Sequence, residues 1–399
     1  MIGQKITCEA CLKIDLIQET NNMYSVYQHW DPLKVCVVGR SYPPEFYSWI
    51  KVPHVRNLFE RIAVETEKDY QNIIKKLQEF QVEVLRTNIP STNDCFINGQ
   101  YIPPPMTPRD WAVMIGDTYY ESSSFDFSRF YSNVKDARWP SCNSLEEFYH
   151  LPTYIQQECF DLHNLQKYIN LDLRYKHIND HVTNQRNLIK KPNISGINGA
   201  MVSRIGQDLY FGTSNYQDDQ QKIKLHIDQE FPNTRNHIVN TGGHSDGTYC
   251  PVTPGLIISL KDVPTYKDTF PGWEVIYLPQ QSWNLVRPFL DLKEKNKGKW
   301  WIPGFEQDQS VIDTVQTWMS HWTGYVEETV FDVNMLIIDP KNVMVFNYNK
   351  QVFDALDRYG ITPHIVPFRH RYFWDGGIHC VTCDLHRSGT KQDYFPDRS

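Results

Sequence analysis

The chain has 399 residues, of which 40% are apolar and 22% charged, so it is long enough to bury a large core and has the composition of a folded protein. Its net charge of −7 argues against a dedicated nucleic-acid-binding protein, because such domains are basic. No run of 18 or more apolar residues occurs, so no membrane-spanning helix is expected.

The nine cysteines are odd in number and scattered along the chain, which is not the pattern of a disulfide framework. The first residues lack the charged-then-apolar order of a signal peptide and the composition of a transit peptide. We therefore expect a cytoplasmic protein with reduced thiols.

The N-terminal part of the chain predicts a strand, a long helix and a second strand. Residues 34–39 and 82–86 are short apolar runs, and residues 57–80 lie between them. Apolar side chains recur there every three or four positions, at Phe59, Ile62, Tyr70, Ile73 and Leu77. Two further short strands are predicted at 111–116 and 118–121.

The middle of the chain predicts similar groupings. We expect strands at 201–206, 208–212 and 237–240 with a helix around 218–230, followed by strands at 256–260 and 273–278.

The C-terminal part shows the order strand, strand, helix, strand most clearly. The strands are predicted at 334–339, 342–346 and 362–368, and the helix at 350–359. Gly360 is expected to end that helix.

Repeated units of this kind share one core only when they stack, so we expect a closed ring of about five units in a single domain spanning 1–399. Residues 1–24 are interpreted as an N-terminal extension. Segments 131–198 and 279–328 interrupt the repeat and are interpreted as insertions, which often form lids or walls over sites.

Cys380 and Cys383, in the stretch GGIHCVTCDLH, allow several interpretations. A zinc site needs four ligands, and the only other Cys-x-x-Cys pair, Cys8 and Cys11, lies at the far terminus. A redox pair belongs at a helix start, whereas this run alternates like a strand. Two buried thiols are the plain structural alternative. The preceding glycine pair argues for a site, since it lets the backbone approach a ligand closely.

Three other positions carry acidic or imidazole groups. His244 and Asp246 are two residues apart on a predicted extended segment, so both side chains can reach one pocket. Asp110 precedes an apolar run, and Asp208 separates two strands. Each feature taken alone is more often structural: an acid in a tight strand turn usually forms that turn.

Taken together and in this order, these segments resemble the amidinotransferases of the arginine:glycine type, in the guanidine-modifying (pentein) superfamily. The resemblance runs from about residue 25 to the end of the chain. It is carried by WDPLKVCVVGR (30–40), PRDWAVMIGDTYYE (108–121), GQDLYF (206–211), HSDGTY (244–249), PGLIIS (254–259), NMLIIDPKNVMV (334–345) and GGIHCVTCDLHRSGT (376–390). It implies an α/β fold, a five-bladed pseudo-symmetric propeller of ββαβ modules around a central active-site cavity.

The resemblance also implies roles. Cys380 is the expected nucleophile and Cys383 a bystander, His244 the general acid and base, and Asp208 the carboxylate partner of that histidine. Asp110 and Asp246 are expected to grip a guanidinium. His379, beside the nucleophile, is interpreted as pointing to the opposite face.

The chemistry suits these residue types. A guanidinium is planar and permanently charged, so carboxylates bind it through paired hydrogen bonds. A thiolate can attack its central carbon, and a histidine can protonate the leaving amine. The expected reaction moves the amidino group of L-arginine to an acceptor amine through an amidino-cysteine, with ping-pong kinetics, release of ornithine, and no metal or cofactor.

Two positions depart from the glycine-specific pattern. Where an arginine is expected to hold the donor's carboxylate, this chain has Val263, and Lys261 is the nearest cation. Where a small hydroxyl residue is expected, two positions before Asn334, it has Asp332. An anion there favours an amine over a carboxylate, so the acceptor is expected to be glycine or another amine.

Two alternatives use the same residues: a deiminase-type hydrolase that forms citrulline and ammonia, and a non-catalytic scaffold. The basic and aromatic run at 368–374 could also be interpreted as an RNA-stacking patch, although packing is favoured in an acidic protein. The expected partners are therefore small-molecule substrates, without nucleic acid or membrane, and family habit suggests a homodimer.

Overall fold

The computed structural model describes residues 24–97, 99–122, 189–193, 199–213, 227–241, 244–260, 265–278, 307–319, 332–374 and 376–398, and isolated residues at 178, 181–182, 224–225, 302 and 304–305. The predicted N-terminal extension, Cys8, Cys11 and Lys261 lie outside the described residues, as do most of the two predicted insertions. In the described part, no helix is both long enough and apolar enough to cross a membrane.

Within those ranges the strands form five three-stranded sheets and one small hairpin. In strand order, the first sheet is β17 (Thr382–Arg387), β1 (Leu33–Val38) and β2 (Glu83–Arg86), and the second is β5 (Ala112–Ile115), β6 (Thr118–Ser122) and β7 (Ile189–Asn193). The third sheet is β8 (Val202–Ile205), β9 (Asp208–Thr213) and β10 (Arg235–Asn240), and the fourth is β11 (Tyr249–Thr253), β12 (Leu256–Ser259) and β13 (Glu274–Tyr277). The last sheet is β14 (Leu336–Asp339), β15 (Asn342–Val345) and β16 (Thr362–Ile365). The hairpin pairs β3 (Phe96–Ile97) with β4 (Gln100–Tyr101).

All five sheets share one topology. The middle strand pairs antiparallel with one neighbour and parallel with the other, as expected for a hairpin followed by a crossover to a third strand. The crossovers of the first and last sheets contain the helices α2 (Pro53–Glu79) and α12 (Lys350–Arg358). The predicted order of strand, strand, helix and strand is present in the last unit. The first unit has the predicted strand, helix and strand, and its remaining strand is β17 from the C-terminal segment.

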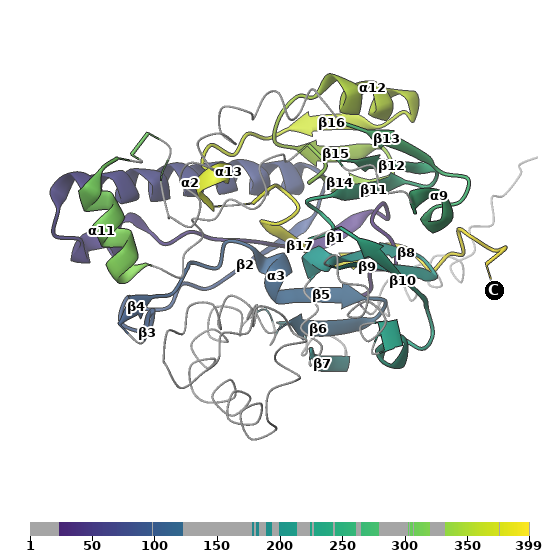
Figure 1. Ribbon diagram of the computed structural model, residues 1–399, viewed down its shortest axis with the longest axis horizontal. Coiled ribbons are helices and arrows are strands. Elements are labelled where there is room, and N and C mark those ends of the chain that lie inside the picture. Colours follow the sequence, from purple (N-terminus) through teal and green to yellow (C-terminus); the bar gives the residue numbers. More distant parts are fainter. Residues whose placement is uncertain are drawn as a thin grey trace, which may run out of the picture.

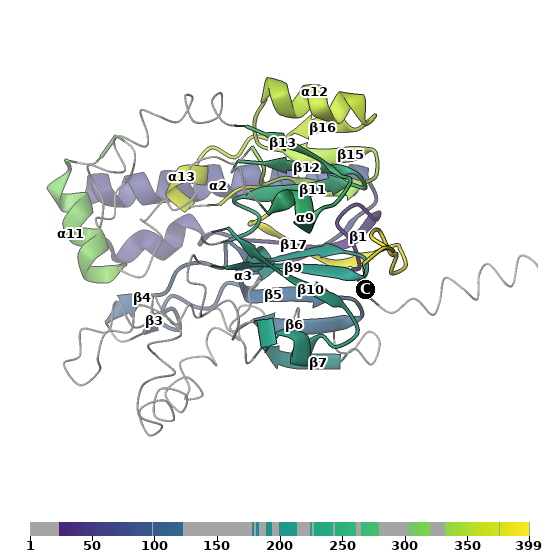
Figure 2. The same cartoon turned by 45° about the vertical axis from the view of Figure 1, so that its right-hand side comes forward.

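The first sheet joins the two ends of the described chain. β1 pairs antiparallel with β17, with Val37 opposite Cys383, and parallel with β2, so the C-terminal segment supplies the strand that the N-terminal unit lacks. Figures 1 and 2 show β17 and β1 in the middle of the molecule, with α2 extending beside them toward α11 (Gln309–Trp318). The turn that carries Cys380 directly precedes β17 and is thereby held centrally.

Four strands were not predicted: β3 and β4 of the small hairpin, and β7 and β11. β7 and β11 contain a proline each, Pro192 and Pro251, and each is an edge strand of its sheet. Proline breaks a strand pattern in the sequence, yet an edge strand tolerates it because one side needs no ladder hydrogen bonds. β7 also lies inside the segment 131–198 that was interpreted as an insertion, so the end of that segment belongs to a sheet.

α12 ends as its sequence indicates. Asn349 caps α12 by accepting hydrogen bonds from the N–H groups of Gln351 and Val352, and Gly360 follows the helix with a positive φ of 67°. α2 is followed by Gln81, whose φ is 58°, and then the chain enters β2.

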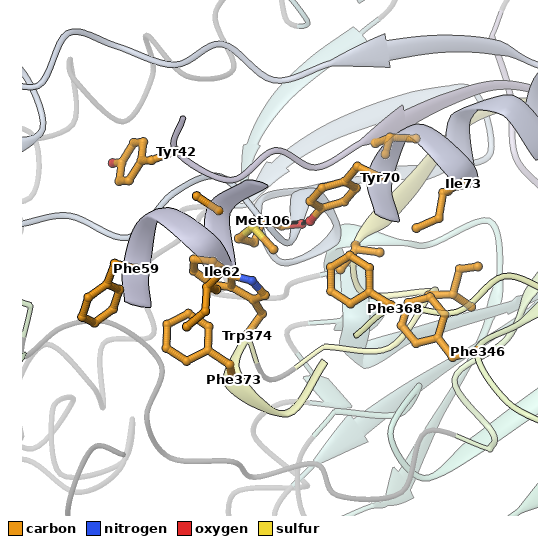
Figure 3. Close-up of a cluster of buried hydrophobic side chains, with 14 of the residues drawn as sticks. Tyr42, Phe59, Ile62, Tyr70, Ile73, Met106, Phe346, Phe368, Phe373 and Trp374 are labelled. Carbon is orange, nitrogen blue, oxygen red and sulfur yellow. Dashed lines mark hydrogen bonds between the residues drawn. The ribbon is translucent and has the colours of Figure 1, made fainter. Parts of the chain in front are cut away.

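The apolar face of α2 packs on the segment that precedes the nucleophile turn (Figure 3). Tyr70 meets Phe368 edge to face, with ring centroids 5.3 Å apart, and Phe368 stacks on Phe346. The indole Nε1 of Trp374, in α13 (Arg371–Trp374), donates to the Thr66 hydroxyl at 2.8 Å. This packing fixes the chain that leads into residues 376–380.

The interpretation of residues 368–374 as an RNA-stacking patch is wrong. Phe368, Phe373 and Trp374 are buried in the core, so their faces are not available to bases. Arg369 pairs with the carboxylate of Asp69 on α2, so this basic group is also used within the fold.

Replacing Ile62 by alanine is expected to lower the free energy of unfolding by about 2–4 kcal/mol, because the side chain is 1% exposed and its loss leaves a cavity. Val64→Ala, on the same helix but 54% exposed, is the matched control and should change stability by less than about 0.5 kcal/mol. Urea denaturation of both variants measures the difference. Equal effects would contradict the assigned face of α2.

Candidate active site

Cys380 lies in a tight turn and not, as its alternating sequence suggested, in a strand. The Val381 N–H donates to the Gly377 carbonyl at 3.1 Å, and β17 begins only at Thr382. Cys383 is inside that strand, buried, with its sulfur 3.3 Å from the Ala112 carbonyl oxygen. Burial raises the pKa of the Cys383 thiol to about 11. The two sulfurs therefore have different surroundings, and Cys380 is the one at the turn.

Asn334, just before β14, holds this turn. Its Oδ1 accepts hydrogen bonds from the backbone N–H groups of His379 at 2.8 Å and Cys380 at 3.3 Å. A Cβ on Gly377 would lie 2.2 Å from that oxygen, so only glycine fits there. The glycine pair was expected to admit a ligand, but the close approach at Gly377 is made by Asn334.

Asp246 brings a carboxylate close to Cys380. Its Oδ2 lies 3.7 Å from the sulfur of Cys380 and 2.8 Å from Nδ1 of His379. The carboxylate is buried, and its position is fixed by the backbone, since the N–H groups of Ser245 and Asp246 both donate to the Ala200 carbonyl. The juxtaposition of Cys380 and Asp246 agrees with the prediction.

His379 points toward the site, contrary to the expectation that it faces away. Nδ1 of His379 is hydrogen-bonded to the carboxylate of Asp246. Burial lowers the pKa of His379 well below its usual 6.5, and the guanidinium of Arg109 lowers it further. A neutral imidazole with its proton on Nδ1 is therefore the form that fits beside Asp246.

His29 packs beside His379, with the two ring centroids 5.8 Å apart. Its Nε2 accepts a hydrogen bond from the Arg204 backbone N–H at 3.1 Å, so the imidazole is held as an acceptor on that side. Burial lowers the pKa of His29 well below 6.5, and the nearby Arg204 adds to the effect. Both histidines, with Asp246, line one small internal pocket.

Asp110 and Arg109 come from α3 (Pro108–Trp111), immediately before β5. The buried Arg109 donates through Nε to the carbonyl oxygens of His379 and Thr382, at 2.9 and 3.1 Å, on either side of the nucleophile. Oδ1 of Asp110 is buried and accepts no hydrogen bond from the described residues. A buried carboxylate oxygen of this kind suits a cationic ligand.

The buried carboxylate of Asp384 forms ion pairs with three arginines next to these residues. It accepts from Nη2 of Arg109 at 3.1 Å, Nη2 of Arg204 at 2.8 Å and Nε of Arg387 at 2.7 Å. Burial alone would raise the pKa of Asp384, but the three guanidiniums outweigh it and hold that pKa well below 3.8. The carboxylate is thus ionised at neutral pH.

His244 lies on the turn that also carries Asp246 and is partly exposed. The hydroxyl of Thr248 donates to its carbonyl oxygen at 3.4 Å. The role of His244 as general acid and base stays a prediction. Its position on the turn that carries Asp246 favours that role.

The assignment of Asp208 as the partner of His244 is wrong. The Asp208 carboxylate is bound by Arg235, Arg398 and Nε2 of His237, the last at 2.6 Å. In the parallel register Asp208 pairs with Arg235, whereas Asn240, which leads toward His244, pairs with Thr213. Asp208 and Thr213 are the two ends of β9, and at the usual rise per strand residue they lie about 16 Å apart.

Asp332 is buried next to the strand that follows Asn334, and its two oxygens accept from the side-chain amides of Asn347 and Asn349. These bonds order the loop before α12. Its predicted contact with an acceptor amine stays a prediction, as does that of Lys261.

Sequence reasoning missed Asn334, His379 and Arg109 as parts of the site. Arg109 and His379 are adjacent in sequence to Asp110 and Cys380, which is a usable signal. Asn334 had no such signal, because its contact with Cys380 spans 46 residues of sequence.

The two buried neutral histidines predict a stability that falls in acid. In the unfolded chain each takes up a proton near pH 6.5, whereas the folded state does not, so lowering the pH through 6.5 favours unfolding by up to about 1.4 kcal/mol per pH unit per histidine. His29→Gln retains an acceptor for the Arg204 N–H and should reduce this slope. Urea denaturation between about pH 7.5 and about pH 5.5 tests it, and an unchanged slope in the variant would contradict the assignment.

No family model matches the chain. It is 23% identical over 421 residues to the mitochondrial glycine amidinotransferase of Xenopus laevis, covering 92% of this chain and 84% of that protein. It is 20% identical to the L-arginine:L-lysine amidinotransferase of Pseudomonas savastanoi pv. phaseolicola, covering 55% and 52%. Among solved structures, SxtG, an amidinotransferase of the saxitoxin biosynthetic pathway from Microseira wollei, is similar with a TM-score of 0.58 at 16% identity, covering 94% and 100%.

The likeness in sequence extends over nearly the whole chain, and the likeness in structure shows a shared α/β fold. The resemblance predicted from the motifs is confirmed: the chain is similar in sequence to amidinotransferases over 92% of its length.

Proposed function

We propose that the protein transfers the amidino group of L-arginine to an acceptor amine through an amidino-cysteine on Cys380, releasing ornithine. The observation that carries this proposal is the approach of the Cys380 sulfur to the Asp246 carboxylate, 3.7 Å, in a buried setting. A thiolate and a carboxylate repel each other unless a cation lies against both. A guanidinium is such a cation, and the buried oxygen of Asp110 offers a second acceptor for its N–H groups.

The reaction follows from these positions. The Cys380 thiolate attacks the central carbon of the guanidinium, and the bond from that carbon to the side-chain nitrogen of the donor breaks. His244 gives a proton to the leaving nitrogen, which departs as the amine of ornithine. The acceptor amine then attacks the amidino carbon, His244 takes up its proton, and the carbon–sulfur bond breaks to restore the thiolate.

Transfer to an amine is supported by the names of two similar proteins, a glycine amidinotransferase and an L-arginine:L-lysine amidinotransferase. The departures at Val263 and Asp332 from the glycine-specific pattern favour an acceptor other than glycine.

We also propose that the five sheets form the five blades of a closed propeller with this site at its centre. The support is the topology that all five sheets share and the pairing of β17 with β1, which joins the ends of the described chain.

Incubation with arginine labelled in its guanidine carbon and a panel of amines, including glycine and lysine, tests the activity. Beyond the single equivalent released when Cys380 is loaded, ornithine should form only when an acceptor is present, and the label should move to that acceptor. Citrulline and ammonia formed without any amine would contradict transfer and support the hydrolase, in which water takes the place of the acceptor.

Cys380→Ala is expected to lower arginine turnover at least about a thousandfold, because the covalent step is lost. Cys383→Ala is the control three residues away, and its turnover should stay within a few-fold of wild type. Mass spectrometry of the wild-type protein after exposure to arginine should find the amidino adduct on Cys380. An adduct on Cys383, or full activity in Cys380→Ala, would disprove the proposed nucleophile.

A further inference from the structure

The side chain of Asn334 makes four hydrogen bonds, and one of them reaches the Cys380 sulfur. Its Oδ1 accepts from two backbone N–H groups, those of His379 and Cys380. Its Nδ2 donates to the Asp246 carbonyl oxygen at 3.2 Å and to Sγ of Cys380 at 3.0 Å. The residue is 1% exposed, so water does not compete for these bonds.

The partners determine which way the amide faces. Two backbone N–H groups can bond only to an acceptor, so the atom facing them is oxygen. The opposite atom is therefore the NH₂ group, and the Asp246 carbonyl, which is an acceptor, agrees with this orientation. One N–H of Asn334 is consequently directed at the sulfur.

An N–H donor distinguishes the two forms of a cysteine. A neutral thiol is a weak acceptor, whereas hydrogen bonds to an ionised group are about twice as strong as neutral ones. The nearby carboxylate of Asp246 acts in the opposite sense before a cationic substrate arrives, because its Oδ2 accepts a hydrogen bond from the neutral thiol at 3.7 Å and would repel a thiolate. The site therefore needs a source of stabilisation for the sulfur anion that is present without substrate.

We infer that Asn334 is a catalytic residue that stabilises the Cys380 thiolate through its amide N–H and aims the sulfur by gripping the turn around it. The absence of a side chain on Gly377 lets the Asn334 amide come this close to the turn, because a Cβ there would lie 2.2 Å from Oδ1. The catalytic meaning of this bond rests on the proposed function, whereas the bond itself can be tested without substrate.

The experiment measures alkylation of Cys380 by iodoacetamide as a function of pH in the full-length protein, by mass spectrometry of the peptide that contains residues 376–386. Cys383 lies in the same peptide, so the measurement is made in a Cys383→Ala background and repeated with Cys383 present as an internal control. In the parent protein the midpoint of alkylation should lie at or below the value of an ordinary thiol, about pH 8.5, despite the adjacent carboxylate.

Two variants separate the N–H from the other features of Asn334. Asn334→Asp keeps oxygens for the two backbone N–H groups but replaces the donor and adds a charge. Asn334→Ala removes the donor without adding a charge. Both should raise the alkylation midpoint by about one to two pH units, which corresponds to the loss of one hydrogen bond to a charged group. Urea denaturation shows that each variant is folded.

A folded Asn334→Ala protein with an unchanged midpoint would overturn the inference, even if Asn334→Asp shifts, because charge alone would then explain the shift. If neither variant folds, a parent midpoint clearly above about pH 8.5 overturns it and a lower one supports it. A shifted midpoint in a protein that does not turn over arginine would refute the proposed function and leave the role of Asn334 intact.

Discussion

The buried ion cluster centred on Asp384 is the interaction on which the site depends. Its carboxylate is shared by Arg109, Arg204 and Arg387, and all four side chains are almost fully buried. They come from α3, β8 and β17, so one carboxylate connects a helix with strands of two sheets. Since three guanidiniums share a single anion, the remaining N–H groups need carbonyl acceptors, among them those of Met114 and Asp31.

The same cluster positions the chemistry. Arg109 uses its Nε to hold the carbonyls of His379 and Thr382, and these flank the nucleophile. The positive charge that Arg109 contributes adds to the effect of burial in lowering the pKa of His379, whose Nδ1 lies 2.8 Å from the Asp246 carboxylate. A chain of contacts from Asp384 through Arg109 and His379 therefore reaches the carboxylate of Asp246, and Asn334, just before β14, holds the turn.

Much of the fold was predictable because it rests on local patterns. The apolar spacing of residues 57–80 predicted α2, and Gly360 marked the end of α12. The edge strands β7 and β11 were missed because Pro192 and Pro251 resemble strand breakers, and only their place at a sheet edge makes them acceptable. Asp208 was misassigned because a carboxylate at a strand turn carries no information about which histidine it will meet.

The sequence by itself determined the residue types that suit guanidine chemistry, the repeated order of strands and helices, and the family in which that order occurs. Only the tertiary structure decided which side chains meet. The bonds of Asn334 to Cys380, of His379 to Asp246 and of Arg109 to Asp384 join residues 46, 133 and 275 positions apart. Such contacts depend on the packing of separate sheets, whereas periodicity and motif spacing report only on neighbours along the chain.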